Sequence, residues 1–294
     1  MRVRSLRPFT LALIAASFAV PTLWAQAAPA QAPQTAQRAQ TGGALAVLET
    51  LPQSPTFKQI QSRTYDFKEA GRPMNYELFL PSHYDRAKPT PLVVALHCLG
   101  SDAQHMIRYE GLTEQAEARG FIVVAPMGYN SRGWYGSRGT GRASERGDAA
   151  ADPANLGELS EKDVMNVLGF VRQEFNIDAK RIYLMGHSMG GGGTWYLGIK
   201  HPDLWAALAP AAPAIYTSPD ALSAITRIPV IVVQGDEDAL VRVDVTRQWV
   251  AKMKELGMKH TYIEVPHGDH MTVIARNPGN MKKVFDTFAG AHRD

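Results

Sequence analysis

Short apolar runs alternate with helix-like stretches along most of the sequence, and this alternation restricts the possible folds more than any other feature. Six apolar runs occur after residue 90, at 91–97, 121–126, 181–186, 205–211, 228–235 and 261–266. Stretches with a helical pattern separate most of them, at 103–118, 160–175, 189–200 and 242–256. Continuous apolar strands that alternate with helices are typical of a parallel sheet covered by helices on both faces.

Two further strands are expected in front of this alternating region. Residues 60–67 and 74–81 alternate apolar and polar side chains, and the sequence KEAGRP between them indicates a hairpin turn. Together with the six apolar runs they give about eight strands. Since there is no internal repeat and no second boundary, we expect one α/β domain over residues 44–294.

The first residues have the layout of a secretory signal peptide. Three arginines, Arg2, Arg4 and Arg7, precede an apolar run at 9–20, and small residues that fit an A-x-A cleavage site follow. The run is short for a membrane span. We predict a signal peptide over 1–27, a flexible spacer rich in Ala, Gln and Pro over 28–43, and export to the periplasm or the medium.

Charge and cysteine content exclude several kinds of partner. The chain has 31 Lys and Arg against 28 Asp and Glu, and without the three signal-peptide arginines the two counts are equal. No block of basic residues suggests a nucleic-acid partner. The single cysteine, Cys98, allows no intramolecular disulfide and does not lie where a lipid anchor would be attached. We therefore expect no stable membrane insertion after signal cleavage.

The sequence Gly186-His187-Ser188-Met189-Gly190 fits the G-x-S-x-G pattern of a nucleophile elbow. It follows an apolar run and precedes a helix-like stretch, as such a turn requires. The elbow holds its serine in a strained backbone conformation, and the glycines let neighbouring segments pass without a clash at Cβ. The pattern predicts Ser188 as a nucleophile.

A nucleophile of this kind requires an acid and then a histidine, each after a later strand. The run at 228–235 is followed by Asp236, Glu237 and Asp238. We favour Asp238, because three residues past Gly235 let the loop turn back toward the serine. Asp236 follows the strand directly and is expected to cap the turn.

The histidine is expected after the run at 261–266, which is followed by His267 and His270. We favour His270, because it comes after the flexible pair Gly268-Asp269. His267, directly at the strand end, is the alternative.

The segment from 127 to 157 is rich in glycine and has no clear period. A loop of this length inside a compact domain is usually functional or disordered. We predict that its aromatic residues line a pocket for the acyl or alcohol group; the alternative is that they only fix the loop to the body. They are Tyr129, Trp134 and Tyr135. Ser160 and Asp163, spaced as a capping box, are predicted to begin the next helix.

From about residue 60 to 290 the chain resembles an α/β-hydrolase. The stretches LHCLGSD, APMGYN, VVQGDEDALV and PHGDH carry the resemblance together with the segment around GHSMG. It is similar to secreted esterases of the feruloyl-esterase and polyhydroxybutyrate-depolymerase type and to prolyl-oligopeptidase-like hydrolases. His97-Cys98-Leu99-Gly100 resembles the H-G-x-G turn of these enzymes, with Cys98 in place of glycine. The resemblance implies that the amides of Met189 and Leu99 form an oxyanion hole, with Cys98 as the alternative to Leu99.

The sequence therefore predicts a secreted serine hydrolase that cleaves carboxylic esters through an acyl-enzyme, with no metal and no organic cofactor. Polymer degradation is not implied, because many secreted polymer esterases of this kind have disulfides. Two alternatives remain open: a serine peptidase of prolyl-oligopeptidase type, and a secreted binding protein without catalytic activity.

Overall fold

The computed structural model describes residues 53–142 and 151–294. The predicted signal peptide (1–27), the predicted spacer (28–43) and the expected start of the domain at residue 44 lie outside the described residues. So does the part of the long loop at 143–150.

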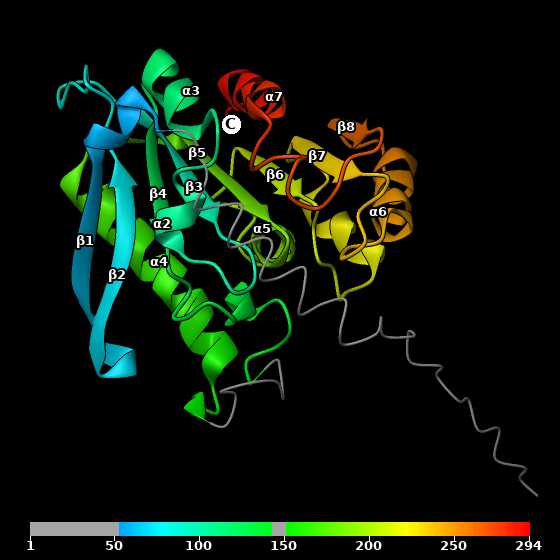
Figure 1. Ribbon diagram of the computed structural model, residues 1–294, viewed down its shortest axis with the longest axis horizontal. Helices are drawn as coiled ribbons and strands as arrows, with labels where there is room; N and C mark the ends of the chain where they lie inside the picture. Colours follow the sequence, from blue (N-terminus) through cyan, green and yellow to red (C-terminus); the bar gives the residue numbers. More distant parts are fainter. Residues whose placement is uncertain (1–52, 143–150) are drawn as a thin grey trace, which may run out of the picture.

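Eight strands form one sheet, as the six apolar runs and the two alternating stretches predicted. They are β1 Ile60–Phe67, β2 Arg72–Phe79, β3 Thr90–Leu96, β4 Ile122–Pro126, β5 Ile177–His187, β6 Ala207–Ala211, β7 Val230–Gly235 and β8 His260–Val265. Their order is β1-β2-β4-β3-β5-β6-β7-β8. The hairpin β1–β2 is antiparallel and β2 is antiparallel to β4, whereas β3 to β8 are all parallel. Figure 1 shows the hairpin at one side of the molecule and β7 and β8 at the other.

Helices cover both faces of this sheet. They are α2 Ala103–Met106, α3 Leu112–Arg119, α4 Leu156–Glu174, α5 Met189–Lys200, α6 Val243–Glu255 and α7 Pro278–Ala289. Short 3-10 helices are η1 Pro55–Gln59, η2 Lys68–Ala70, η3 Trp134–Gly136 and η5 Pro219–Ile225. One buried cluster joins α2, α3 and α7 to the sheet, and a second joins α4, α5 and α6 to it.

The central strand β3 shows why these runs are uniformly apolar. All seven of its residues are buried. Val93 and Ala95 belong to the cluster with α3 and α7, and Leu92 and Val94 belong to the cluster with α4 and α5. Because successive side chains on a strand point to opposite faces, a strand covered on both sides needs apolar residues at every position.

The stretch expected as one helix at 103–118 is divided into α2 and α3. The break includes Gly111, whose φ of 86° lies in the left-handed region that glycine adopts readily. A Cβ there would also lie 3.1 Å from the Cα of Pro278, at the start of α7. Close packing of α3 against α7 therefore requires glycine at this point, and the break places Tyr109 inside the protein with no exposed surface.

Helix α4 begins at Leu156, so the prediction that Ser160 and Asp163 form its N-terminal capping box is wrong. The two side chains are buried within the helix. Ser160 Oγ donates to the carbonyl of Gly128 (2.6 Å) and accepts from the amide of Tyr135 (3.0 Å). The hydroxyl of Ser160 therefore binds the loop after β4 and does not cap its own helix.

Asp163 anchors the same loop to the hairpin. Its carboxylate accepts hydrogen bonds from the amide of Gly128 (2.6 Å) and the hydroxyl of Tyr65 on β1 (2.5 Å). Burial raises the pKa of Asp163 to about 6, although these hydrogen bonds act in the opposite direction. The carboxylate thus stabilises the loop at the expense of holding a charge inside the protein.

Asp163→Ala should lower the free energy of unfolding by about 2 kcal/mol, because it leaves buried donors on Gly128 and Tyr65 without an acceptor. The exposed Asp203→Ala is the control and should change it by less than about 0.5 kcal/mol. The raised pKa of Asp163 adds a further contribution to the stability of the wild type, which is fully present below the unfolded pKa near 3.8 and is lost as the pH rises through about 6.

The stability difference between wild type and Asp163→Ala should therefore grow between pH 7 and pH 4 in urea titrations. A difference that shrinks over this range would contradict the raised pKa of Asp163.

Candidate active site

Ser188 lies at the turn between β5 and α5, at the carboxyl end of the parallel strands. Its φ of 57° and ψ of −113° are strained for a residue with a side chain. The turn is held by its own backbone: the amide of Ser188 donates to Ala211 O, and its carbonyl accepts from the amides of Gly192 and Ala214, all at 2.9 Å. The backbone conformation is the one that the elbow pattern predicts for Ser188.

The glycines after Ser188 leave room for the main chain of two neighbouring loops. A Cβ on Gly190 would overlap the carbonyl oxygen of Leu96, at the end of β3. A Cβ on Gly192 would overlap the carbonyl oxygen of Ala214, in the loop after β6. The first turn of α5 therefore packs directly against backbone on two sides, which explains why the sequence has glycine here.

Gly190→Ala should lower the free energy of unfolding by about 1–3 kcal/mol, because the methyl group must displace the end of β3. The matched control is Gly169→Ala in α4, where a Cβ would meet no atom within 4 Å. That substitution should leave the stability unchanged or raise it by up to about 1 kcal/mol, since alanine is the better helix former. Urea unfolding measures both; equal effects would show that the close approach to Leu96 carries no energetic weight.

Asp238 follows β7 and is the acidic residue that the structure holds in place. Its Oδ1 accepts from the amides of Leu240 (2.9 Å) and Val241 (2.8 Å), and its Oδ2 accepts from Gln234 Nε2 (3.1 Å). Burial acts to raise the pKa of Asp238, but the hydrogen bonds from His270 and from the two amides outweigh it and lower the pKa below its ordinary value. The carboxylate is thus buried and ionised at neutral pH.

His270 follows β8 and meets Asp238. Its Nδ1 lies 2.7 Å from Asp238 Oδ2, and both residues are less than a tenth exposed. The alternative, His267, is exposed and pairs with Glu237 at 2.7 Å. Of the two histidines that the sequence analysis considered, His270 is the buried one, and it pairs with the favoured acid, Asp238.

The main chain of His270 also reaches the elbow. His187, the residue before Ser188, lies with its Nε2 2.8 Å from the carbonyl oxygen of His270, and the two imidazole rings are 4.8 Å apart. Among the hydrogen bonds of the described residues there is none between Ser188 and His270. The structure thus joins His270 to His187, the residue that precedes the serine.

The predicted oxyanion donors flank the same turn. Met189 is the first residue of α5, where a helix leaves its amide groups without intrahelical partners. The loop that contains Leu99 lies against this turn, since the carbonyls of Leu96 and His97 are the closest neighbours of Gly190. Leu99 is exposed and Cys98 is buried. Burial raises the pKa of the Cys98 thiol, which does not favour a nucleophilic thiolate.

The three aromatic residues of the long loop have different positions. Tyr135 has no exposed surface, and its hydroxyl donates to the carbonyl of His97 (3.3 Å), so it fixes the loop to the body. Tyr129 lies against Phe67 of the hairpin, with Arg72 over its ring at 4.2 Å. The prediction that these two tyrosines line a substrate pocket is therefore not supported by their positions.

Trp134 has an edge contact with Tyr216, which follows β6 (ring centroids 5.2 Å apart). The guanidinium of Arg138 lies over both rings. Trp134 is nearly buried, whereas Tyr216 is 56% exposed. The exposed aromatic surface of this cluster therefore belongs to Tyr216, which the sequence analysis missed because no local pattern marks it.

Gln234 is a second residue that sequence reasoning missed. It is completely buried at the end of β7, accepts from Thr246 Oγ1 (3.0 Å) and donates to Asp238. A glutamine inside an apolar run was the only signal for it.

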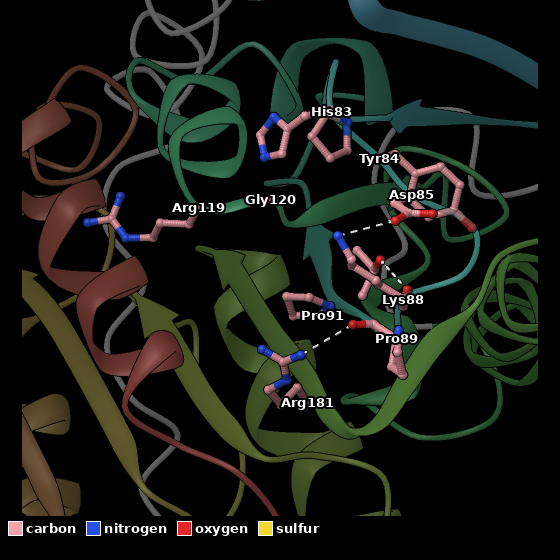
Figure 2. Close-up of a pocket in the computed structure, with 11 residues that line it drawn as sticks. His83, Tyr84, Asp85, Lys88, Pro89, Pro91, Arg119, Gly120 and Arg181 are labelled. Carbon is pink, nitrogen blue, oxygen red and sulfur yellow. Dashed lines mark hydrogen bonds and ion pairs between the residues drawn. The ribbon is translucent and has the colours of Figure 1, made fainter.

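Two surface pockets lie away from these residues. Figure 2 shows one of about 290 Å³ at the amino end of β3, lined by residues that include His83, Lys88, Arg119 and Arg181. Its basic side chains pair with acids: Lys88 with Asp85, Arg119 with Asp286 and Arg181 with Asp178. Parallel sheets place their sites at the carboxyl ends of the strands, so this pocket is not the candidate site.

In 53–142 and 151–294, no cluster of three or more His, Cys, Asp or Glu side chains has an arrangement that could hold a metal ion. None of the helices in these ranges has the length and apolar character of a membrane span.

The sheet order, the elbow and the covering helices define an α/β-hydrolase fold. The same fold is found in the ferulic acid esterase of Anaeromyces mucronatus, solved in complex with ferulic acid. The two structures superpose with a TM-score of 0.61 at 20% identity, over 82% of this chain and 95% of that chain.

The chain belongs to the Esterase family, whose model matches residues 68–272. It is 27% identical over 175 residues to a bifunctional acetylxylan esterase/xylanase of Neocallimastix patriciarum, covering 59% of this chain and 23% of that protein. It is 31% identical over 149 residues to the S-formylglutathione hydrolase of Rattus norvegicus, covering 48% and 51%. The chain thus matches about half or less of the length of these curated relatives. The predicted resemblance to α/β-hydrolase esterases is confirmed.

Proposed function

We propose that this protein is a serine hydrolase that cleaves carboxylic esters through an acyl-enzyme intermediate. The observation that carries the proposal is the buried pair of Asp238 and His270, which is hydrogen-bonded to the residue that precedes the strained Ser188. Ser188, Asp238 and His270 follow β5, β7 and β8 at the carboxyl edge of the sheet. This placement supports the roles of nucleophile, orienting carboxylate and base that acyl transfer requires. Membership of the Esterase family and the esterases among the relatives favour ester substrates.

In the proposed reaction the hydroxyl of Ser188 attacks the ester carbonyl while His270 Nε2 takes its proton. Nε2 is the free nitrogen, because Nδ1 is bonded to Asp238. Asp238, which is ionised, holds this tautomer and stabilises the imidazolium that forms. His270 then gives the proton to the leaving alcohol, and a water molecule activated by His270 releases the acid.

The proposed oxyanion donors are the amides of Met189 and Leu99. Met189 is at the N-terminus of α5, whose dipole favours negative charge. Cys98 remains the alternative to Leu99, since both belong to the loop that lies against Gly190.

Leu99, Tyr216 and Leu240 form a rim that we propose to bind the substrate. They are three of the four large exposed hydrophobic side chains of the described residues, and they follow β3, β6 and β7 at the edge where Ser188 lies. Apolar side chains around convergent polar groups are typical of small-molecule sites. We also propose that the protein acts outside the cytoplasm, on the support of the signal-peptide pattern in residues 1–27.

Ser188→Ala should reduce the hydrolysis of p-nitrophenyl acetate by about three or more orders of magnitude, because the remaining residues then lack a nucleophile. His270→Ala should cost about as much, since the members of a triad act as a unit. A fluorophosphonate probe should label the wild type and not Ser188→Ala. Labelling of the wild type would also indicate an enzyme, whereas a binding protein that has lost catalysis should not be labelled.

His267→Ala is the matched control for the histidine, because His267 is exposed and pairs with Glu237. It should keep activity within about threefold of the wild type. Full activity in His270→Ala together with a large loss in His267→Ala would show that His267, and not His270, is the base.

Tyr216→Ala should lower kcat/KM for a bulky aromatic ester by about tenfold more than for an acetyl ester, because it removes the exposed ring of the rim. Its melting temperature should stay within about 1 °C, since the side chain is largely exposed. Phe170→Ala, at an exposed position on α4, is the control and should affect both esters equally. Equal losses on both esters in Tyr216→Ala would exclude the ring from the substrate site.

A further inference from the structure

His187 has a buried hydrogen bond on each of its ring nitrogens, and neither belongs to the proposed proton transfer. Its Nε2 lies 2.8 Å from the carbonyl oxygen of His270, and its Nδ1 lies 2.8 Å from the hydroxyl oxygen of Tyr109. Both His187 and Tyr109 have no exposed surface. A buried histidine with two fixed partners has only one tautomer that satisfies both of them.

The carbonyl of His270 determines which tautomer this is. A carbonyl oxygen only accepts hydrogen bonds, so the hydrogen of His187 must be on Nε2. Burial, together with the neighbouring charge of His270, lowers the pKa of His187 to about 3, so the ring is neutral and has a single N–H. Nδ1 must then accept, and the hydroxyl of Tyr109 is its donor.

The same chain of hydrogen bonds continues to the loop after β3. Tyr109 Oη lies 3.7 Å from Cys98 Sγ. Because the single proton of Tyr109 is directed to His187, a hydrogen bond between Tyr109 and Cys98 requires the thiol of Cys98 as its donor. Burial raises the pKa of Cys98 and keeps this proton on sulfur at neutral pH. The bonds therefore run in one direction, from Cys98 through Tyr109 and His187 to His270.

We propose that His187 is a positioning residue that fixes the main chain of His270 to the turn that holds Ser188, and that Tyr109 supports this tautomer by donating to the other ring nitrogen of His187. The side chain of His270 is held by Asp238, and its carbonyl is held by His187, so the base is fixed at two points. His187 adjoins Ser188 in the chain, so the second point ties the base to the turn that holds the nucleophile. This inference rests on the proposed role of His270 as the base.

Two substitutions of His187 distinguish a role in positioning His270 from a role in packing alone. In His187→Gln the amide nitrogen extends about as far as Nε2, and it can donate to His270 O. In His187→Asn the amide is shorter and reaches only the position of Nδ1, on the side of Tyr109. We expect His187→Asn to lower kcat about 10- to 100-fold with KM within about threefold of the wild type, because the base is displaced. His187→Gln should recover at least about a third of the wild-type kcat.

Equal losses in both variants, or wild-type kcat in His187→Asn, would overturn the proposal. A second measurement holds even if the asparagine variant does not fold. In wild-type protein with nitrogen-15 histidine, the signals of His187 at pH 7 should show a protonated Nε2 and an unprotonated Nδ1. Tyr109→Phe should shift the Nδ1 signal and leave the proton on Nε2. A proton on Nδ1 of the wild type, or on both nitrogens, would contradict the assignment.

The nitrogen measurement does not depend on catalysis. If Ser188→Ala kept its activity, the proposed function would fail while the tautomer of His187 could still be confirmed. If Ser188→Ala is inactive and His187→Asn has a normal kcat, only the positioning role is excluded.

Discussion

The close approach between the first turn of α5 and two neighbouring stretches of backbone is the constraint on which the site depends. Gly190 lies against the end of β3, and Gly192 lies against the loop after β6. The amide of Ser188 is bonded to Ala211, and its carbonyl is bonded to Ala214. These contacts hold the serine at a φ that an unconstrained residue would leave, so its conformation is a property of three segments and not of one.

Electrostatics and hydrogen bonding then place the histidine with respect to that turn. Asp238 is ionised in a buried site because His270 and two backbone amides donate to it. Gln234 adds a further donor from β7. His187 approaches from the other side, from β5, and it is kept neutral by burial. A second positive charge at this position would oppose the protonation of His270 during the proposed reaction.

Much of this arrangement could be predicted from the sequence, because the relevant signals are local. Uniformly apolar strands such as β3 and the glycine-rich start of α5 follow from patterns within a few residues. The start of α4 was predicted wrongly, because Ser160 and Asp163 bond to a loop about thirty residues away, and spacing within the helix does not reveal that partner. Tyr135, Tyr216 and Gln234 obtain their positions in the same way, from contacts that only the folded chain creates.

The glycines of the first turn of α5 determine which parts of the site can change in sequence and which cannot. Residues 190–193 have no side-chain atoms with which to contact a substrate, and an added Cβ at any of them would displace a neighbouring segment. We expect substrate preference to come from the loops around the turn, which carry the proposed rim residues Leu99, Tyr216 and Leu240. New substrate preferences are best sought by varying these three loops while residues 186–193 are left unchanged. A library built in this way keeps the proposed chemistry while it varies the proposed substrate rim.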